Sequence, residues 1–266
     1  MSNFQFINPS HLSEEAKNLF SSDFNNAKPY KHLVIDHFLK EEIAQKIYDH
    51  FPEYEKFNKK YDGLNERKAE GSNFEDFDPM FTELKKEISS QEFCDWIAKV
   101  TGVEKSFVTD DAMGAGLHQG KNGSFLDIHI DYSMHHLQKV YRRLNLLIFF
   151  NPGWKDEWAG HTELWNEDMT VCEKKVRPDF NRCVIFETTG NSYHGYGKIS
   201  PPEEITRKSF YTYFYTHENV NHKEGYHDTI FKPRPDDSTS KKLKTSVKET
   251  LKNFAKQQFV KFGIKF

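Results

Sequence analysis

Short β-strand patterns fill the middle of this chain and limit its fold more than any other feature. From about residue 101 to 216, short runs of apolar, aromatic and β-branched residues alternate with turn residues. Many short strands separated by turns are typical of an antiparallel β-sandwich or a jelly roll. We therefore expect a mainly β core of the jelly-roll type in this region.

Helical patterns flank the β region on both sides. Residues 13–20 begin with Ser13, a favourable N-cap residue, and residues 40–51 and 80–100 place apolar side chains at helical spacing. The expected fold class is therefore mainly β with flanking helices (α+β). Its parts, expected to form one structural domain, are an extension over 1–100 that packs on the core, a jelly-roll core over 101–218, and a strap with a helix over 219–266.

The composition favours a soluble enzyme in a reducing compartment. A net charge of −3 argues against general affinity for nucleic acid. No apolar run reaches the length of about 18 residues that suggests a membrane span. The three cysteines have no spacing pattern, and the N-terminus lacks the basic and apolar segments of a secretory signal. We expect a cytoplasmic protein.

Two histidines and one aspartate form a candidate metal site. His129 and Asp131 lie in IHID, and alternate side chains of a strand share one face, so both project together. His194 follows the buried-strand pattern CVIFE and a turn that contains Gly190. Two imidazoles and one carboxylate can bind a mononuclear Fe(II) on one side and leave about three positions for a chelating cosubstrate and O₂.

Arg207 is the fourth residue of this set. It opens a strand pattern, RKSFYTYFYT, that ends at Thr216. A guanidinium can bind a carboxylate through two hydrogen bonds, which is what a dicarboxylate cosubstrate would need at its distal end. Ser209 lies two residues further on the same face and is a candidate hydroxyl donor to the same ligand.

These residues and their neighbours resemble the iron- and 2-oxoglutarate-dependent dioxygenases, specifically the branch related to prolyl 4-hydroxylases. The resemblance covers about residues 32–218 and is also carried by HLVIDHFLKEEIAQKIYDHFP, RRLNLLIFFNPGW and AGHTELW. The chain departs from that branch in two places. Collagen-type prolyl hydroxylases usually have lysine at the position of Arg207, and many have a tyrosine shortly before the first histidine, where this chain has Phe125 and Leu126.

The resemblance implies a double-stranded β-helix, with iron held by His129, Asp131 and His194, and Arg207 paired with the 5-carboxylate of 2-oxoglutarate. The cofactors and cosubstrates would be Fe(II), 2-oxoglutarate and O₂, with ascorbate as a reductant. The reaction would convert 2-oxoglutarate to succinate and CO₂ and hydroxylate a substrate C–H. A carboxylate at Asp131 favours hydroxylation over halogenation, whereas desaturation and cyclisation stay open.

In one of the two registers available to RLNLLIFFN, Asn145, Leu147 and Phe149 face inward. By resemblance these three residues line the 2-oxoglutarate pocket, with Asn145 as a hydrogen-bonding partner and the other two as walls. The candidates for the substrate side are His118, Gln119, Tyr132 and Trp165. For His118 and Gln119 the alternative is a structural hydrogen bond.

Four other histidines are weighed against the candidate ligands. His135 and His136 follow Asp131 closely, and we expect loop residues near the site entrance that either touch substrate or are only solvated. His161 and His222 each begin an H-x-E tripeptide, which mimics the ligand pair. Neither has a second histidine at a suitable place, so we do not expect them to bind the metal.

Two segments outside the core have separate interpretations. Residues 55–78 are polar and weakly periodic, so we expect an exposed loop or lid at the site entrance. The C-terminal helix, residues 239–262, is expected to dock its apolar stripe on the protein or on a second subunit and to leave its lysines in water. A membrane surface or an anionic partner is the alternative. The stripe consists of Leu243, Val247, Leu251, Phe254 and Phe259.

Three functions are consistent with the sequence. The favoured one is a hydroxylase of a small molecule, such as an amino acid or a biosynthetic intermediate. The second is a peptidyl hydroxylase of the prolyl type, which would need an open groove rather than a closed pocket under residues 55–78. The third is a jelly-roll sensor or scaffold that binds metal and dicarboxylate without catalysis. The expected partners are thus a small molecule or peptide and, through the C-terminal helix, a second copy of the chain.

Overall fold

The computed structural model describes residues 4–218 and 226–261. Its strands form one continuous antiparallel sheet in the order β1-β10-β7-β12-β4-β3-β5-β11-β8-β9, with β13 beside β5, β2 beside β3 and β6 beside β7. The strands are β1 (His32–Ile35), β2 (Lys59–Asp62), β3 (Glu66–Gly71), β4 (Ala115–Gly120), β5 (Phe125–Ile130), β6 (Met134–His135), β7 (Val140–Phe149), β8 (Thr162–Trp165), β9 (Cys172–Val176), β10 (Arg182–Glu187), β11 (His194–Tyr196), β12 (Arg207–Thr216) and β13 (Ile230–Phe231).

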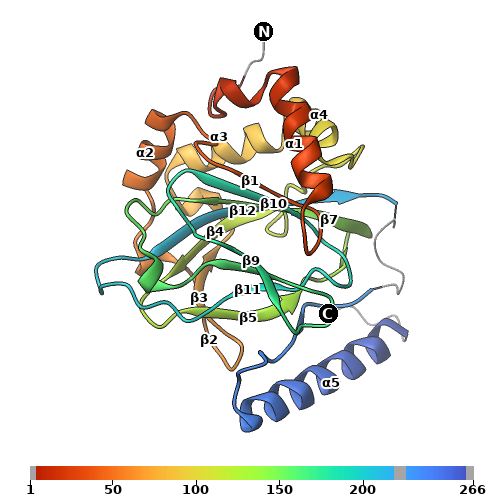
Figure 1. Ribbon diagram of the computed structural model, residues 1–266. Helices are drawn as coiled ribbons and strands as arrows, with labels where there is room; N and C mark the ends of the chain where they lie inside the picture. Colours follow the sequence, from red (N-terminus) through yellow and green to blue (C-terminus); the bar gives the residue numbers. More distant parts are fainter. Residues whose placement is uncertain (1–3, 219–225, 262–266) are drawn as a thin grey trace.

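This sheet folds back on itself at β3. Strand β3 pairs with β4 on one side and with β5 on the other, so it joins a larger layer, β1-β10-β7-β12-β4, to a smaller one, β5-β11-β8-β9. The two layers lie one above the other in Figure 1. The predicted mainly β fold with flanking helices is therefore confirmed.

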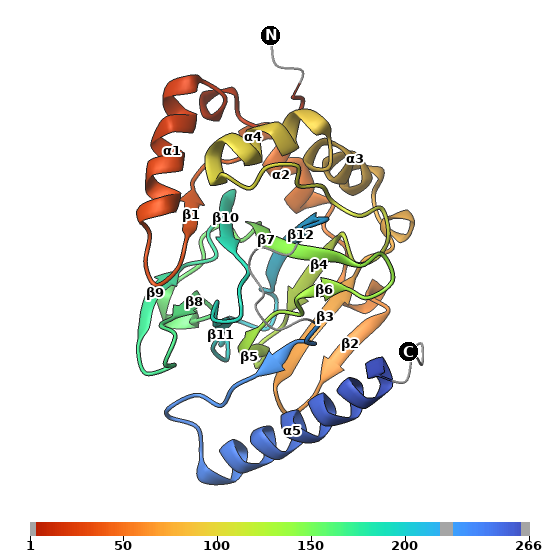
Figure 2. The same ribbon diagram turned by 90° about the vertical axis from the view of Figure 1, so that its right-hand side faces the viewer.

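The N-terminal helices cover the outer face of the larger layer (Figures 1 and 2). Strand β7 shows how the sequence specifies this arrangement: Leu144, Leu146 and Ile148 are fully buried in one core cluster with helix residues such as Phe93 and Ile97. The alternate residues of β7 face the space between the layers. The helices are α1 (Glu14–Asn26), α2 (Glu41–Asp49), α3 (Pro79–Ile88), α4 (Gln91–Thr101) and α5 (Thr239–Lys261), and short 3₁₀ turns lie at Pro9–His11, Tyr54–Lys56, Phe74–Asp76 and Asp156–Trp158.

The helical pattern over 80–100 forms two helices instead of one. The backbone at Ser90 is extended, and its side chain accepts a hydrogen bond from the Phe93 amide, which begins α4 immediately after α3 ends. Helix α4 then stops at Gly102, whose φ of +75° is the left-handed conformation that favours glycine at a helix C-terminus. A capping serine inside an apolar periodic run is the signal that separates the two helices.

Residues 55–78 lie beside the site, as expected, but they are not a loop, and that part of the prediction was wrong. They contain β2 and β3, which form a hairpin and supply the strand that joins the two layers. Alternate residues of β3, Glu66, Lys68 and Glu70, line a cavity. The polar composition that suggested a solvated loop belongs instead to a strand whose side chains face a polar cavity.

The C-terminal helix differs from one of the two predicted arrangements, docking on the protein, whereas docking on a second subunit stays a prediction. Leu243, Val247 and Leu251 are 65%, 48% and 64% exposed, so this apolar stripe does not dock on the protein. Buried Thr245 and Glu249 lie on the docked side instead. Phe254 and Phe259 lie beyond the last side chain described, Lys252. Figure 1 shows α5 on the opposite side of the sheet from the N-terminal helices. None of the helices within residues 4–218 and 226–261 has the length and apolar character of a membrane span.

Candidate functional site

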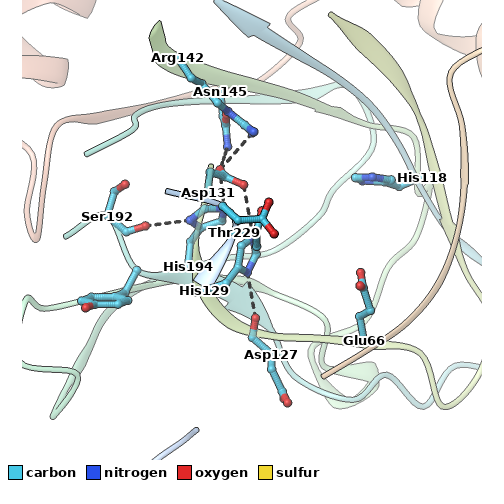
Figure 3. Close-up of polar contacts among 12 residues, drawn as sticks. Glu66, His118, Asp127, His129, Asp131, Arg142, Asn145, Ser192, His194 and Thr229 are labelled. Atoms are coloured by element: carbon cyan, nitrogen blue, oxygen red, sulfur yellow. Dashed lines mark hydrogen bonds and ion pairs between the residues drawn. The ribbon is translucent and has the colours of Figure 1, made fainter. Parts of the chain in front are cut away.

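The three candidate ligands meet between two paired strands (Figure 3). His129 on β5 is directly opposite His194 on β11, and Asp131 follows β5. The Nε2 atom of His129 lies 3.6 Å from Asp131 Oδ1, and that of His194 lies 3.3 Å from Asp131 Oδ2. One donor atom from each residue lies within 4.8 Å of the others, and all three side chains are buried. This spacing fits a single metal ion.

Close strand packing brings the two histidines together. A Cβ atom at Gly195 would lie 2.6 Å from the Leu126 carbonyl oxygen and 2.8 Å from the Asp127 carbonyl oxygen. Because these are backbone atoms of β5, they cannot move aside easily. Glycine after His194 therefore lets β11 approach β5 closely enough for the two imidazoles to share one ion.

Hydrogen bonds fix both imidazoles in the orientation that a metal requires. The Nδ1 atom of His129 lies 2.9 Å from the Asp127 carbonyl oxygen, and that of His194 lies 2.9 Å from the Ser192 carbonyl oxygen (Figure 3). A carbonyl oxygen can only accept, so Nδ1 carries the proton and Nε2 keeps its lone pair for a ligand. Burial lowers the pKa of His129, and the nearby His194 lowers it further, which favours the neutral, metal-binding form.

A buried arginine and an amide hold the Asp131 carboxylate (Figure 3). Arg142 Nη2 lies 3.0 Å from Asp131 Oδ2, and Asn145 Nδ2 donates to the same oxygen at 2.7 Å. Arg142 also donates to Asn145 Oδ1 from Nε at 2.9 Å and from Nη2 at 2.7 Å. Burial alone would raise the pKa of Asp131, but the Arg142 charge holds it well below its ordinary value. The carboxylate is thus kept ionised and oriented.

Arg142 was not predicted from the sequence. It lies three residues before Asn145, a spacing that places two strand residues on opposite faces. A register irregularity between β7 and β12, where Tyr215 pairs with Arg142 and Phe214 with Leu144, brings both side chains to the same face. The one available signal is a charged residue at the start of a strongly apolar strand. The Arg142 guanidinium lies 3.4 Å from the centre of the Tyr213 ring.

A cavity of about 570 Å³ opens beside the three candidate ligands. Besides Arg207, five further residues of the predicted site lie on its wall, and Figure 3 shows His118 across the cavity from the ligand group. The amide of Asn145 is engaged by Arg142 and Asp131, a set of partners that the sequence does not indicate. The five residues are His118, Tyr132, Asn145, Leu147 and Ser209.

Arg207 is a buried cation in the wall of this cavity. Its Nε donates to the Gly160 carbonyl oxygen at 2.9 Å, and its Nη2 lies 3.4 Å from Thr162 Oγ1. Its guanidinium carbon lies 4.2 Å from the Tyr196 ring centre and 4.9 Å from that of Phe149. Among the described residues, no carboxylate lies within ion-pair distance of it, and burial lowers its pKa to about 10. The guanidinium is thus available to an anion in the cavity.

Two predicted substrate-side residues do not reach the cavity. Gln119 follows His118 on β4, and strand alternation turns its side chain away, where Nε2 donates to Thr206 Oγ1 at 2.9 Å. Trp165 donates from Nε1 to Glu163 Oε2 at 2.9 Å and does not line the cavity either.

Among the other histidines, His135 differs most from its prediction. It is fully buried on β6, with Nε2 2.7 Å from Asp111 Oδ2, so it is not a solvated loop residue at the entrance. His161 bonds to Asp156 at 3.1 Å, and His222 lies outside the described residues. His161 does not join the candidate ligands in the part of the chain that the structure describes.

Comparison with known proteins identifies the core. Residues 115–215, which span β4 to β12 and contain all three candidate ligands and Arg207, match the family model of the 2OG-Fe(II) oxygenase superfamily. The match covers the β core and not the segments on either side of it. It supports a dioxygenase, an enzyme class that uses Fe(II), 2-oxoglutarate and O₂. A comparison with curated proteins found no match to this chain.

Solved structures support the same fold. A prolyl hydroxylase from Trichoplax adhaerens, in complex with a hypoxia inducible factor peptide fragment, aligns with a TM-score of 0.54 and 14% identity over 78% of this chain and 93% of its own. A 2OG-Fe(II) oxygenase family oxidoreductase from Burkholderia pseudomallei gives 0.53 and 11% over 79% and 94%. The non-heme alpha ketoglutarate dependent epimerase SnoN from nogalamycin biosynthesis gives 0.51 and 9% over 86% and 89%. The double-stranded β-helix predicted from the sequence is thus confirmed.

Proposed function

We propose that this oxygenase binds Fe(II) through His129, Asp131 and His194 and binds the distal carboxylate of 2-oxoglutarate through Arg207. The observation that carries the proposal is the pairing of two features in one cavity. The first is a group of three buried ligands in which both histidines have the Nε2 lone pair directed to a metal. The second is the buried Arg207 guanidinium, which has no carboxylate partner among the described residues. A dicarboxylate that bridges the two would satisfy both.

The residues around this site have separable tasks. Arg207 holds the cosubstrate, and Leu147 forms part of the wall beside it. Arg142 and Asn145 keep Asp131 ionised and oriented before the metal binds. When bound, Fe(II) and 2-oxoglutarate supply the activation of O₂, and the overall reaction converts 2-oxoglutarate, O₂ and a substrate C–H to succinate, CO₂ and the C–OH product.

We further propose that the substrate is a small molecule such as an amino acid or a biosynthetic intermediate. The cavity volume, about 570 Å³, is within the range of small-molecule pockets. The β2–β3 hairpin contributes Lys59 and Glu66 to the wall, and the C-terminal segment contributes Thr229 and Phe231. Walls from two separate parts of the chain limit the space for an extended peptide.

A peptidyl hydroxylase is the second candidate, because one solved structure of the same fold is a prolyl hydroxylase with a bound peptide. A non-catalytic sensor or scaffold is disfavoured, because all three candidate ligands and Arg207 are intact. A peptide substrate would need the strap that carries β13 or the β2–β3 hairpin to move aside.

Succinate release separates these candidates. Purified protein with Fe(II), 2-oxoglutarate and O₂ is incubated with two panels, one of free amino acids and other small metabolites and one of proline-containing peptides. We expect stimulation of succinate release, together with an oxygenated product by mass spectrometry, only in the small-molecule panel. Stimulation by the peptides alone would overturn the substrate class. Asp131→Ala is the control for activity that does not come from this site.

A further inference from the structure

Helix α5 turns its polar side to the protein. Thr245 is fully buried and accepts a hydrogen bond at 2.9 Å from Asn65 Nδ2, a side chain in the β2–β3 turn. Glu249, also buried, accepts from the Phe231 amide at 3.2 Å. The helix therefore leaves its leucines in solvent and directs charged and hydroxyl side chains toward the protein, which is the reverse of an ordinary docked amphipathic helix.

Three lysines lie along this polar side, and their partners differ. Lys241 lies 2.9 Å from Asp127, a residue of β5, and this pair anchors the helix. Lys252 lies 2.7 Å from Glu249 of the same helix and 3.9 Å from Asp228, so it also has carboxylate partners. Lys248 instead donates to the neutral side-chain oxygen of Asn65 at 3.3 Å. No carboxylate lies within ion-pair distance of Lys248 in residues 4–218 and 226–252.

Lys248 is also a cavity residue. It is an exposed residue that lines the cavity together with Lys252 of the same helix and Phe231 of β13. The two lysines that the β2–β3 hairpin contributes to the cavity wall have a carboxylate beside them. Lys68 lies 3.5 Å from Glu70, and Lys59 lies 3.9 Å from the same residue. On the cavity wall, Lys248 and Arg207 are thus the cations whose described partners are all neutral.

A ring connects Lys248 to the candidate metal site. The Lys248 ammonium lies 5.7 Å from the centre of the Phe231 ring, and that ring lies 5.5 Å from the His129 ring. Phe231 is directly opposite His129 in the pairing of β13 with β5. A molecule lying along Phe231 would have one end beside the metal and the other end beside Lys248.

We propose that Lys248 binds an anionic group, a carboxylate or a phosphate, at the end of the substrate that is remote from the reacting carbon. The proposal rests on the proposed function, because it uses the same cavity, and it adds a substrate class and a specificity residue on α5. A charge-assisted hydrogen bond to an ammonium fixes the end of a small molecule and so positions its C–H.

Anion binding tests this directly. Protein loaded with Mn(II) and 2-oxoglutarate, so that Arg207 is occupied, is titrated by calorimetry with inorganic phosphate and with acetate at constant ionic strength. We expect saturable binding of one of the two anions by the wild type. Lys248→Gln should weaken it by about tenfold or more, since tenfold corresponds to about 1.4 kcal/mol. Stronger binding of phosphate would assign a phosphate substrate, and stronger binding of acetate a carboxylate substrate.

Lys244→Gln is the matched control, because Lys244 is an exposed lysine one turn earlier on the same helix and does not line the cavity. Equal affinity of the Lys248 variant and the wild type, or no saturable binding by the wild type, would overturn the proposal. The titration is repeated without metal and 2-oxoglutarate. A difference between the two variants there supports the anion site even if cosubstrate loading, and with it the proposed function, fails.

Discussion

Replacing Arg207 with methionine should have opposite effects on the empty protein and on cosubstrate binding. Burial lowers the pKa of Arg207 from 12.5 to about 10, so the folded state disfavours the charged form. At neutral pH this corresponds to a penalty on the order of 3 kcal/mol. Methionine removes that penalty but also removes the hydrogen bonds to Gly160 and Thr162, each worth about 1 kcal/mol. The empty variant should therefore be as stable as the wild type or slightly more stable.

The same substitution should strongly weaken the binding of 2-oxoglutarate. Loss of a buried charge-assisted pair costs about 2–4 kcal/mol, which weakens affinity by roughly 30-fold to 1000-fold. In the presence of Mn(II), 2-oxoglutarate at about 100 times its Kd should stabilise the wild type by about 2.7 kcal/mol. That gain should raise the unfolding temperature by several degrees. The variant at the same concentration should gain little.

Thermal unfolding with and without 2-oxoglutarate measures both effects in one assay. Lys208→Met is the control, because Lys208 is the next residue on β12 and bonds to Thr206 outside the cavity. That variant should keep the full shift of the wild type. An equal shift in the Arg207 variant would place the cosubstrate elsewhere. A large loss of stability in the empty Arg207 variant would refute the argument that its buried charge is uncompensated.

Three further changes test other parts of the site. Arg142→Met removes the cation that orients Asp131, so affinity for Mn(II), measured by titration, should fall about 10-fold to 100-fold, and unchanged affinity would contradict this role. Gly195→Ala inserts a Cβ atom against the β5 backbone, so the free energy of unfolding measured in urea should fall by about 1–3 kcal/mol. Metal binding should also weaken. If neither quantity changes, β11 can shift freely. His118 has its pKa lowered to about 4 by burial, below the unfolded value of 6.5, so its contribution to stability is complete above pH 6.5 and is lost as pH falls toward 4. The wild type should lose on the order of 2–3 kcal/mol over this range, and the same pH dependence in His118→Gln would exclude that origin.

The sequence was sufficient for the parts of the site that depend on local patterns. Strand alternation places His129 and Asp131 on one face, and it also predicts that Leu144 and Asn145 face opposite layers of β7. The strand after His194 carries Arg207 into the same cavity. Each of these inferences needs only the period of a strand and the chemistry of the side chain.

The misinterpretations come from long-range contacts. From the sequence alone, a polar strand such as β3 looks like a loop. Only its pairing with β4 and β5 shows that its polar side chains face a cavity and not solvent. The docked face of α5 is chosen by Asn65 and Phe231, residues distant in sequence, and not by the helix's own apolar stripe. Arg142 reaches Asp131 only because of a register irregularity between β7 and β12, which no local sequence pattern indicates.

We propose that the three buried donors and Arg207 form one iron and 2-oxoglutarate site. Its most direct test is the visible absorption of anaerobic protein on addition of Fe(II) and 2-oxoglutarate. We expect a weak metal-to-ligand charge-transfer band that requires both additions and is lost in Asp131→Ala. A folded wild-type protein without the band, or an unchanged band in Asp131→Ala, would contradict it.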